Sequence, residues 1–137
     1  MRSPVVPNPR RVLVVDDQPH VRRIVSAKLQ KAGYEVLVAE DGEEALAMAR
    51  EQRPDVLVAD YRMPGIDGMD LCRMLQDDPA TANIPVVLLT AYDAQVLQQP
   101  LGNANIRVMV SKPFSASDIV RVVSNLVCGD STTARAV

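Results

Sequence analysis

The sequence predicts an α/β fold in which helices cover both faces of a parallel five-stranded sheet. Short, continuous apolar runs alternate along the chain with segments whose apolar residues recur at helical spacing. A run without polar alternation is typical of a strand that is buried on both faces. Parallel strands need crossover connections, and right-handed crossovers place the connecting helices on both sides of the sheet. The 137 residues, of which 47% are hydrophobic and 23% charged, are enough for one globular domain.

The first strand, the first helix and the second strand have clear sequence boundaries. Val12–Val15 is the first apolar run, and Pro19 then suits the first turn of a helix. The apolar residues of this helix recur at helical spacing, at Val21, Ile24, Val25 and Leu29. Gly33 is a suitable C-terminal stop, and Glu35–Ala39 follows as the second strand.

The next segments predict a second helix and a third strand. Asp41 and Gly42 form a turn before an alanine-rich helix over Glu43–Gln52. Pro54 ends this helix, because proline lacks the backbone donor that a helix interior needs. Val56–Ala59 is then the third strand.

The second half of the chain repeats the pattern with one ambiguous stretch. A loop over 61–67 leads into a short helix over Met69–Gln76, and Ile84–Leu89 is the fourth strand. Ile106–Val110 is the fifth strand. The intervening residues 92–105 should hold a fourth helix, which a proline and a glycine shorten or break.

The last helix opens with a capping signal. Ser115 and Asp118 have the spacing of a capping box. The apolar stripe of the helix consists of Ile119, Val122, Val123 and Leu126. We expect one domain over residues 11–127, a flexible lead-in over 1–10, and a flexible tail or the start of a linker over 128–137.

Composition argues against several classes of function. The net charge of -2 and the pI near 5.3 provide no basic surface for nucleic acid or anionic lipid. No run approaches the about 18 apolar residues of a membrane-spanning helix. Two widely separated cysteines, Cys72 and Cys128, are typical of free thiols in a reducing compartment. We therefore expect a cytoplasmic protein with no direct contact to nucleic acid or membrane.

Polar residues stand at the C-terminal ends of four of these strands. Asp16 and Asp17 follow the first strand, Asp60 the third, Thr90 the fourth and Lys112 the fifth. In the flavodoxin-like strand order 2-1-3-4-5, ligands bind at such ends between strands one and three. Three carboxylates gathered there would repel one another, which a hard divalent cation such as Mg²⁺ would relieve. With a hydroxyl and an ammonium nearby, the set fits a carboxylate that attacks phosphorus.

These residues also carry a resemblance to a known family. Further short motifs occur in the expected order on the expected strand ends. They are Asp41-Gly42, Met63-Pro64-Gly65, Asp67-Gly68, Thr90-Ala91 and Lys112-Pro113-Phe114. Over roughly residues 10 to 127, the chain resembles the receiver domain of two-component response regulators.

The resemblance implies a role for each of these residues. Asp60 would accept a phosphoryl group from the phosphohistidine of a sensor histidine kinase or of a phosphotransfer protein. Asp17 and Asp60 would bind Mg²⁺ directly, and Asp16 would bind it through water. The backbone carbonyl of Arg62 would be a further metal ligand. The phosphoryl oxygens would be held by Thr90 and Lys112.

The resemblance also implies that the protein is a switch and not an enzyme. This switch would promote its own phosphorylation and dephosphorylation. Phosphorylation would shift a conformational equilibrium and change binding through the face near the fourth and fifth helices. The partner would be a downstream protein target or a C-terminal output domain that this chain lacks. Two departures from the family fall on this face. They are Met109, where the family often has Tyr or Phe, and the segment 100–105.

Two residues beside the motif positions are expected to tune the reaction. Arg62 and Tyr92 each follow a site residue by two positions, so their side chains would flank the entrance to the phosphoryl group. We expect them to affect how fast water attacks the aspartyl phosphate.

Other functions are compatible with parts of this pattern. A phosphatase with an aspartyl-phosphate intermediate usually has a second Asp two residues after the nucleophile, where this chain has Arg62. A phosphorylation-independent protein-interaction module with the same fold is the main alternative. Asp16 or Asp17 could also simply cap the helix that begins near Pro19.

Overall fold

The computed structural model describes residues 10–90, 105–111 and 114–127. Within these ranges, five parallel strands form one sheet in the order β2-β1-β3-β4-β5, which confirms the predicted fold class. The strands are β1 (Arg11–Val15), β2 (Glu35–Ala39), β3 (Val56–Asp60), β4 (Val86–Thr90) and β5 (Ile106–Ser111). The helices are α1 (Pro19–Lys31), α2 (Gly42–Gln52), α3 (Gly68–Gln76) and α5 (Ala116–Val127).

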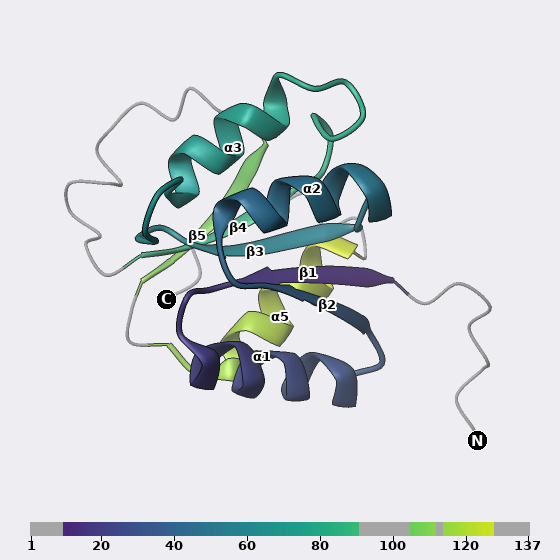
Figure 1. Ribbon diagram of the computed structural model, residues 1–137. Helices are drawn as coiled ribbons and strands as arrows, with labels where there is room; N and C mark the ends of the chain where they lie inside the picture. The colour runs from purple at the N-terminus through teal and green to yellow at the C-terminus, as the bar shows by residue number, and fades with distance from the viewer. Residues whose placement is uncertain (1–9, 91–104, 112–113, 128–137) are drawn as a thin grey trace.

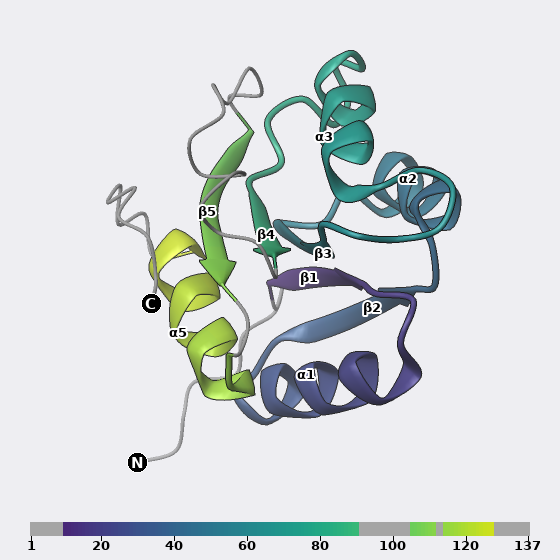
Figure 2. The same cartoon turned by 90° about the vertical axis from the view of Figure 1, so that its left-hand side faces the viewer.

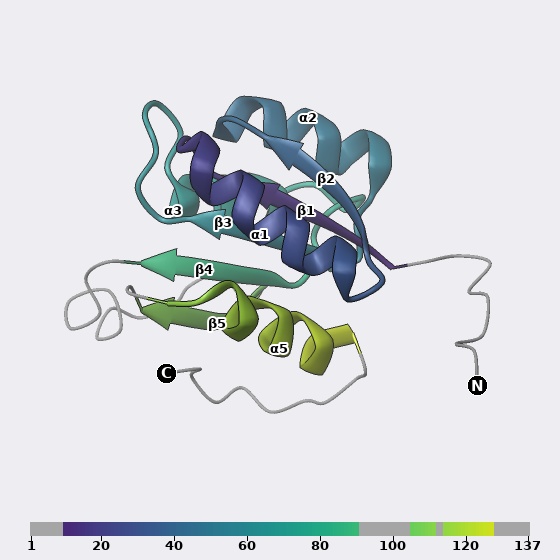
Figure 3. The same cartoon turned by 90° about the horizontal axis from the view of Figure 1, so that it is seen from below.

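The helices form two layers around the sheet. Figure 1 shows α2 and α3 on one face and α1 and α5 on the other, and the turned view in Figure 2 agrees. Seen from below in Figure 3, α1 and α5 run beside each other across the sheet. A hydrogen bond between the Tyr34 hydroxyl and Ser124 Oγ, at 2.8 Å, links the turn between α1 and β2 to α5. The sheet is therefore covered on both faces, as its apolar strands predict.

Each face of the sheet has its own apolar core. Successive side chains of a strand point to opposite faces. In β1, Leu13 and Val15 belong to the core under α2 and α3, whereas Val12 and Val14 belong to the core over α1 and α5. All four side chains are at most 2% exposed. Burial on both faces is the reason that β1, β3 and β4 contain unbroken apolar runs.

The fourth strand begins later than the sequence predicts. β4 starts at Val86, two residues after the expected start at Ile84. The Ile84 N–H donates to the Thr81 carbonyl at 3.1 Å, so this residue is part of a turn. Pro85 has no N–H to donate to a ladder, although its carbonyl accepts from the Leu57 N–H at 3.0 Å. Because Ile84 is part of this hydrogen-bonded turn, the strand begins only after it.

Three strands end one residue later than predicted, and this matters for the site. Asp60, Thr90 and Ser111 are the last residues of β3, β4 and β5. The two polar site residues in this set therefore belong to the sheet itself. Their positions are fixed by strand pairing rather than by a loop.

The helix starts are capped as the sequence suggests, with one exception. The Asp41 side chain accepts from the Glu44 N–H at 2.8 Å at the start of α2. The predicted capping box of α5 is confirmed, because Ser115 and Asp118 exchange hydrogen bonds at 3.1 and 3.0 Å. α1 differs, because its N-cap residue Gln18 makes no side-chain capping hydrogen bond.

Several predictions fall on residues outside the described ranges. They concern the fourth helix within 92–104, the side chains of Tyr92, Lys112 and Cys128, and the ends 1–9 and 128–137. Among the described helices, none has the length and apolar character that a membrane crossing requires.

Candidate functional site

Asp16, Asp17 and Asp60 meet at one edge of the sheet. β1 and β3 are neighbours with Val15 opposite Ala59, so the residues that follow, Asp16 and Asp60, emerge side by side. Carboxylate oxygens of the three aspartates all lie within 4.8 Å of one another. Asp16 and Asp60 are only 1% and 4% exposed, whereas Asp17 is open to solvent. The cluster thus has a buried base and one accessible member.

The turn between β1 and α1 is held by its own hydrogen bonds. The Asp16 N–H donates to the Ala39 carbonyl of β2 at 3.3 Å, which continues the ladder between the two strands. Asp16 Oδ1 accepts from the Gln18 N–H at 2.9 Å. Arg22 Nη1 donates to the Asp16 backbone carbonyl at 2.6 Å. Since Gln18 is the N-cap of α1, the interpretation of Asp16 or Asp17 as the cap of this helix is wrong.

The loop between β3 and α3 forms one wall of an open cleft. The cleft has a volume of about 610 Å³ and begins beside the acidic cluster. It is lined by Asp17, Tyr61, Arg62, Met63, Pro64 and Asp67. The loop is anchored at both ends, because the Tyr61 N–H donates to Leu89 O at 2.7 Å and the Gly68 N–H donates to Tyr61 O at 2.8 Å. The fold therefore contains an open approach to Asp17, the exposed member of the acidic cluster.

Gly68 allows the start of α3 to lie against the end of β3. A Cβ at this position would be 2.7 Å from the Asp60 carbonyl oxygen and 2.8 Å from Leu88 Cδ1. Neither distance is tolerable, and one of the two atoms is backbone. The glycine thus brings α3 close to the strand end that carries Asp60.

Thr90 lies on the side of Asp60 opposite to the other two aspartates. β3 and β4 pair with Asp60 opposite Leu89, which places Thr90 one residue beyond, at the end of β4 and 0% exposed. Thr90 in turn pairs with Ser111 of β5. Lys112 follows Ser111 in the chain and lies outside the described residues.

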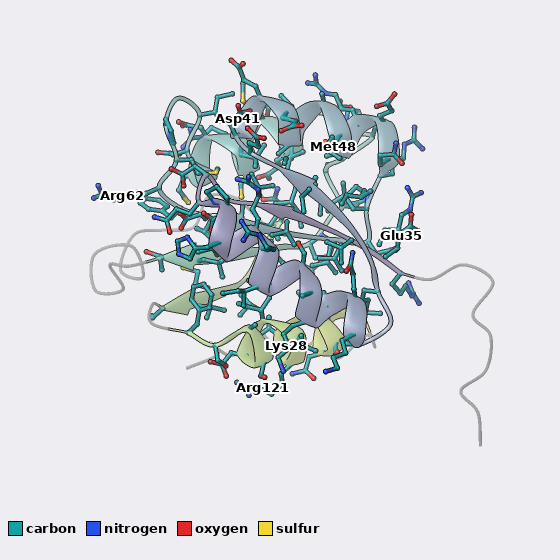
Figure 4. The ribbon with its side chains drawn as sticks, turned by 60° about the horizontal axis from the view of Figure 1, so that its bottom comes forward. Lys28, Glu35, Asp41, Met48, Arg62 and Arg121 are labelled. Carbon is teal, nitrogen blue, oxygen red and sulfur yellow. The ribbon has the colours of Figure 1, made fainter. Side chains whose placement is uncertain are left out.

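Arg62 lies at the mouth of the cleft. Its side chain is exposed, and Figure 4 shows it extending outward from the end of the sheet where the strands terminate. The structure therefore brings Asp16, Asp17, Asp60, Thr90 and Arg62 to the same end of the sheet.

Comparison with known proteins decides the family. A family model of the response regulator receiver domain matches residues 12–124. The chain belongs to the response regulator receiver family. It is 33% identical over 119 residues to Protein PilH of Pseudomonas aeruginosa, a match that covers 87% of this chain and 98% of that protein.

Receivers that are similar to this chain occur in proteins of different length. The chain is 52% identical over 85 residues to the response regulator PleD of Caulobacter vibrioides, and this match covers 62% of the chain but only 19% of PleD. The solved structure of the chemotaxis response regulator CheY4 of Vibrio cholerae matches with a TM-score of 0.79 and 32% identity. That match covers 87% of this chain and 99% of CheY4. This receiver thus spans about a fifth of PleD and nearly all of CheY4.

The donor set of this receiver fits the cation that the family uses. Receiver domains bind Mg²⁺ at an acidic aspartate cluster. Mg²⁺ prefers carboxylate and carbonyl oxygens together with retained waters. Here three carboxylates converge and one of them faces an open cleft, so oxygen ligands and room for water occur together.

Met109, which stands where the family often has Tyr or Phe, is buried. Met109 is 4% exposed and packs in the same apolar core as Leu88 of β4. Its side chain therefore fills space within the core at this end of the sheet. The other departure, the segment 100–105, is described only at Asn105, which is 5% exposed and donates through Nδ2 to the Cys72 carbonyl at 3.0 Å.

Two residues that help to build the site were not predicted from the sequence. Arg22 is not among the predicted site residues, because its bond goes to a backbone carbonyl and leaves no sequence signature. The second is Gly68, which appeared only as part of a short motif. A glycine directly after the N-cap of a helix, where alanine would favour helix formation, is a signal that could have indicated the close approach.

Proposed function

We propose that this receiver is a phosphorylation-dependent signalling switch with Asp60 as the phosphoacceptor. The observation that carries the proposal is the convergence of Asp60 with Asp16 and Asp17 beside an open cleft. Asp60 is the central member of the site, because the acidic turn lies on its β1 side and Thr90 on its β4 side. A carboxylate in this position has charged carboxylates on one side and the Thr90 hydroxyl on the other, beside a cleft that a phosphoryl donor could enter.

The chemistry is a transfer of a phosphoryl group from nitrogen to oxygen. A carboxylate oxygen of Asp60 attacks the phosphorus of a phosphohistidine, a P–O bond forms, and the P–N bond breaks. The imidazole leaves with the electron pair of that bond and is protonated from solvent. Mg²⁺ held by Asp17, Asp60 and the Arg62 carbonyl, and by Asp16 through water, would neutralise charge on the transferring group.

Thr90 and Lys112 complete the proposed site. The Thr90 side chain is fully buried at the end of β4, so its hydroxyl is positioned by the sheet. Lys112 comes directly after the strand residue that pairs with Thr90. We assign to both the role of holding the oxygens of the new aspartyl phosphate, with Lys112 as a point charge.

Phosphorylation then acts by shifting a conformational equilibrium. The new group adds a charge of about -1.5 to -2 at neutral pH. Thr90 and Lys112 would bind it better in one conformer, and the shift cannot exceed that difference in free energy. A change from 1:99 to 99:1 needs about 5.5 kcal/mol. The face near the fourth helical segment and α5 would transmit the change to a partner.

The partners follow from this role. The donor would be a sensor histidine kinase or a phosphotransfer protein, and the receiver domain would be residues 11–127. The acceptor of the signal would be a separate protein target or an output domain in the same polypeptide. We infer a cytoplasmic setting, where a phosphohistidine donor and Mg²⁺ are both available.

Intact-mass measurement tests the proposal. The chain is incubated with Mg²⁺ and acetyl phosphate, and we expect one added phosphoryl group that disappears in Asp60→Asn and when EDTA replaces Mg²⁺. Asp77→Asn removes an exposed carboxylate at the end of α3 and should leave the adduct intact. A wild-type chain that gains no phosphoryl group would contradict the proposal and favour a phosphorylation-independent interaction module.

A further inference from the structure

The acidic turn between β1 and α1 has an unusual support. Asp16 and Asp17 stand in the three residues that separate the strand from the helix. A side chain of the N-cap residue would ordinarily hold such a turn against the first helical turn. In α1, Gln18 is the N-cap and makes no such bond, and the first turn contains no acidic residue.

Arg22 supplies the missing connection. Its backbone N–H donates to the Gln18 carbonyl at 3.1 Å, which is the first hydrogen bond of the helix. Its side chain turns back and donates through Nη1 to the Asp16 carbonyl at 2.6 Å. One residue therefore holds the turn on both sides of Asp17. A charged donor makes a shorter and stronger hydrogen bond than a neutral one, and this bond is partly buried.

We propose that Arg22 is a positioning residue for the Mg²⁺ site. By fixing the Asp16 carbonyl, it sets the direction in which the Asp16 and Asp17 carboxylates leave the backbone toward Asp60. Arg22 acts through Asp16 and contacts neither the cation nor the phosphoryl group. This inference rests on the proposed function, because it assumes that the aspartate cluster binds Mg²⁺.

A purely electrostatic role for Arg22 predicts the opposite change in Mg²⁺ affinity. A guanidinium near a cation site repels the cation, so its removal alone should tighten Mg²⁺ binding. Loss of a positioning hydrogen bond should instead weaken Mg²⁺ binding, because the ligands must be ordered when the ion binds. The direction of the change therefore separates the two roles.

Arg23 provides a matched control. It is the next residue of α1, carries the same charge and, with Arg22, lines the same groove between α1 and β2. It is exposed, and the Asp16 carbonyl receives its hydrogen bond from Arg22 rather than from Arg23. Substitution by methionine at either position keeps most of the apolar stem and removes one positive charge.

The test is a Mg²⁺ titration by calorimetry of wild type, Arg22→Met and Arg23→Met, with thermal unfolding recorded for each. We expect the Kd for Mg²⁺ to rise about tenfold in Arg22→Met and to stay equal or fall in Arg23→Met. The rise in Arg22→Met should persist at higher salt, because a geometric effect is not screened. Amide hydrogen exchange at Asp17 and Gln18 should also accelerate in Arg22→Met.

Each outcome has a defined meaning. An unchanged or lower Kd in Arg22→Met, or an equal rise in both variants, would overturn the positioning role while leaving the proposed function intact. A loss of thermal stability without a change in Kd would mean that Arg22 is only structural. If wild type bound no Mg²⁺, both the proposed function and this inference would fall. If Arg22→Met did not fold, Arg22→Gln would replace it, because its shorter neutral side chain cannot supply the charged hydrogen bond to the Asp16 carbonyl. An unchanged Kd in Arg22→Gln would contradict the proposal.

Discussion

Among the described residues, Arg62 is well placed to limit access of water to Asp60, the proposed phosphoacceptor. It follows Asp60 by two positions, lines the cleft together with Asp17, and extends into solvent from the end of the sheet (Figure 4). Its long side chain can cover the approach to Asp60 without being buried. The other residue expected to flank this entrance, Tyr92, lies outside the described residues.

Truncation of Arg62 should therefore shorten the life of the aspartyl phosphate. We expect Arg62→Ala to lose its phosphoryl group several-fold faster than wild type, because water reaches phosphorus more easily. The decay is followed by intact mass after the phosphodonor is removed. Arg107 is an exposed arginine near the start of β5, at the end of the sheet opposite to the site. The phosphoryl group of Arg107→Ala should be lost at the wild-type rate. An unchanged half-life in Arg62→Ala would rule out a role of this side chain in shielding.

Single residues differ in how well the sequence reveals them. Asp16, Asp17, Asp60 and Thr90 were predictable because they stand where an apolar run ends, and parallel strands end at the same edge. Arg22 was not, because its bond goes to a backbone carbonyl, which any residue provides. A pattern of residue types therefore locates the acidic groups but not the bonds that orient them.

At the scale of elements, α5 depends on a capping box that is sensitive to pH. The backbone hydrogen bond from Ser115 holds the pKa of the Asp118 carboxyl below its usual value, and the Ser115 hydroxyl and the Arg121 charge act in the same direction. A lowered pKa in the folded state means that ionised Asp118 stabilises the fold. This contribution is complete above the unfolded-state value of about 3.8 and is lost as the pH falls through the folded-state pKa.

Denaturant unfolding of Asp118→Asn and Ser115→Ala tests this cap. We expect Asp118→Asn to be less stable than wild type near neutral pH, and the difference should shrink as the pH falls below about 4. Ser115→Ala should lose about 1 kcal/mol, the usual contribution of an N-cap side chain. Asp77→Asn changes an exposed aspartate and should remain close to wild type. A difference for Asp118→Asn that does not vary with pH would contradict the assignment.

Elements were predicted well where local and tertiary signals agree. α2 and α5 have both an apolar stripe and a capping side chain, and their predicted starts lie within one residue of the observed ones. β4 was placed too early, because Ile84 is apolar and buried but belongs to a turn. The bond from Asn105 to the carbonyl of Cys72 in α3 was also not predictable, since it joins segments 33 residues apart.

At the scale of the whole molecule, a separate apolar core on each face stabilises the sheet. The reactivity of Cys72 measures how accessible one of these cores is to solvent. Cys72 is 0% exposed and belongs to the core under α2 and α3. Burial raises the pKa of its thiol to about 12, with a smaller contribution from the Asp67 charge that Arg73 opposes. At about pH 8, only about one thiol in ten thousand is then the reactive thiolate.

Alkylation of Cys72 should therefore follow global unfolding. In a Cys128→Ser background, we expect negligible labelling by iodoacetamide in the native protein and rapid labelling once denaturant unfolds it. The labelling rate is measured by intact mass across a denaturant series and compared with unfolding followed by circular dichroism. Rapid labelling without denaturant would mean that the core under α2 and α3 opens locally.

We propose above all that the sheet brings three carboxylates together to hold a cation and to present Asp60 to phosphorus. A crystal structure grown with Mg²⁺ and beryllofluoride, a stable mimic of a phosphoryl group, tests it most directly. We predict beryllium bonded to a carboxylate oxygen of Asp60, and a magnesium ion in contact with Asp17 and Asp60. Beryllofluoride on another residue, or magnesium away from these aspartates in an otherwise folded chain, would contradict the account.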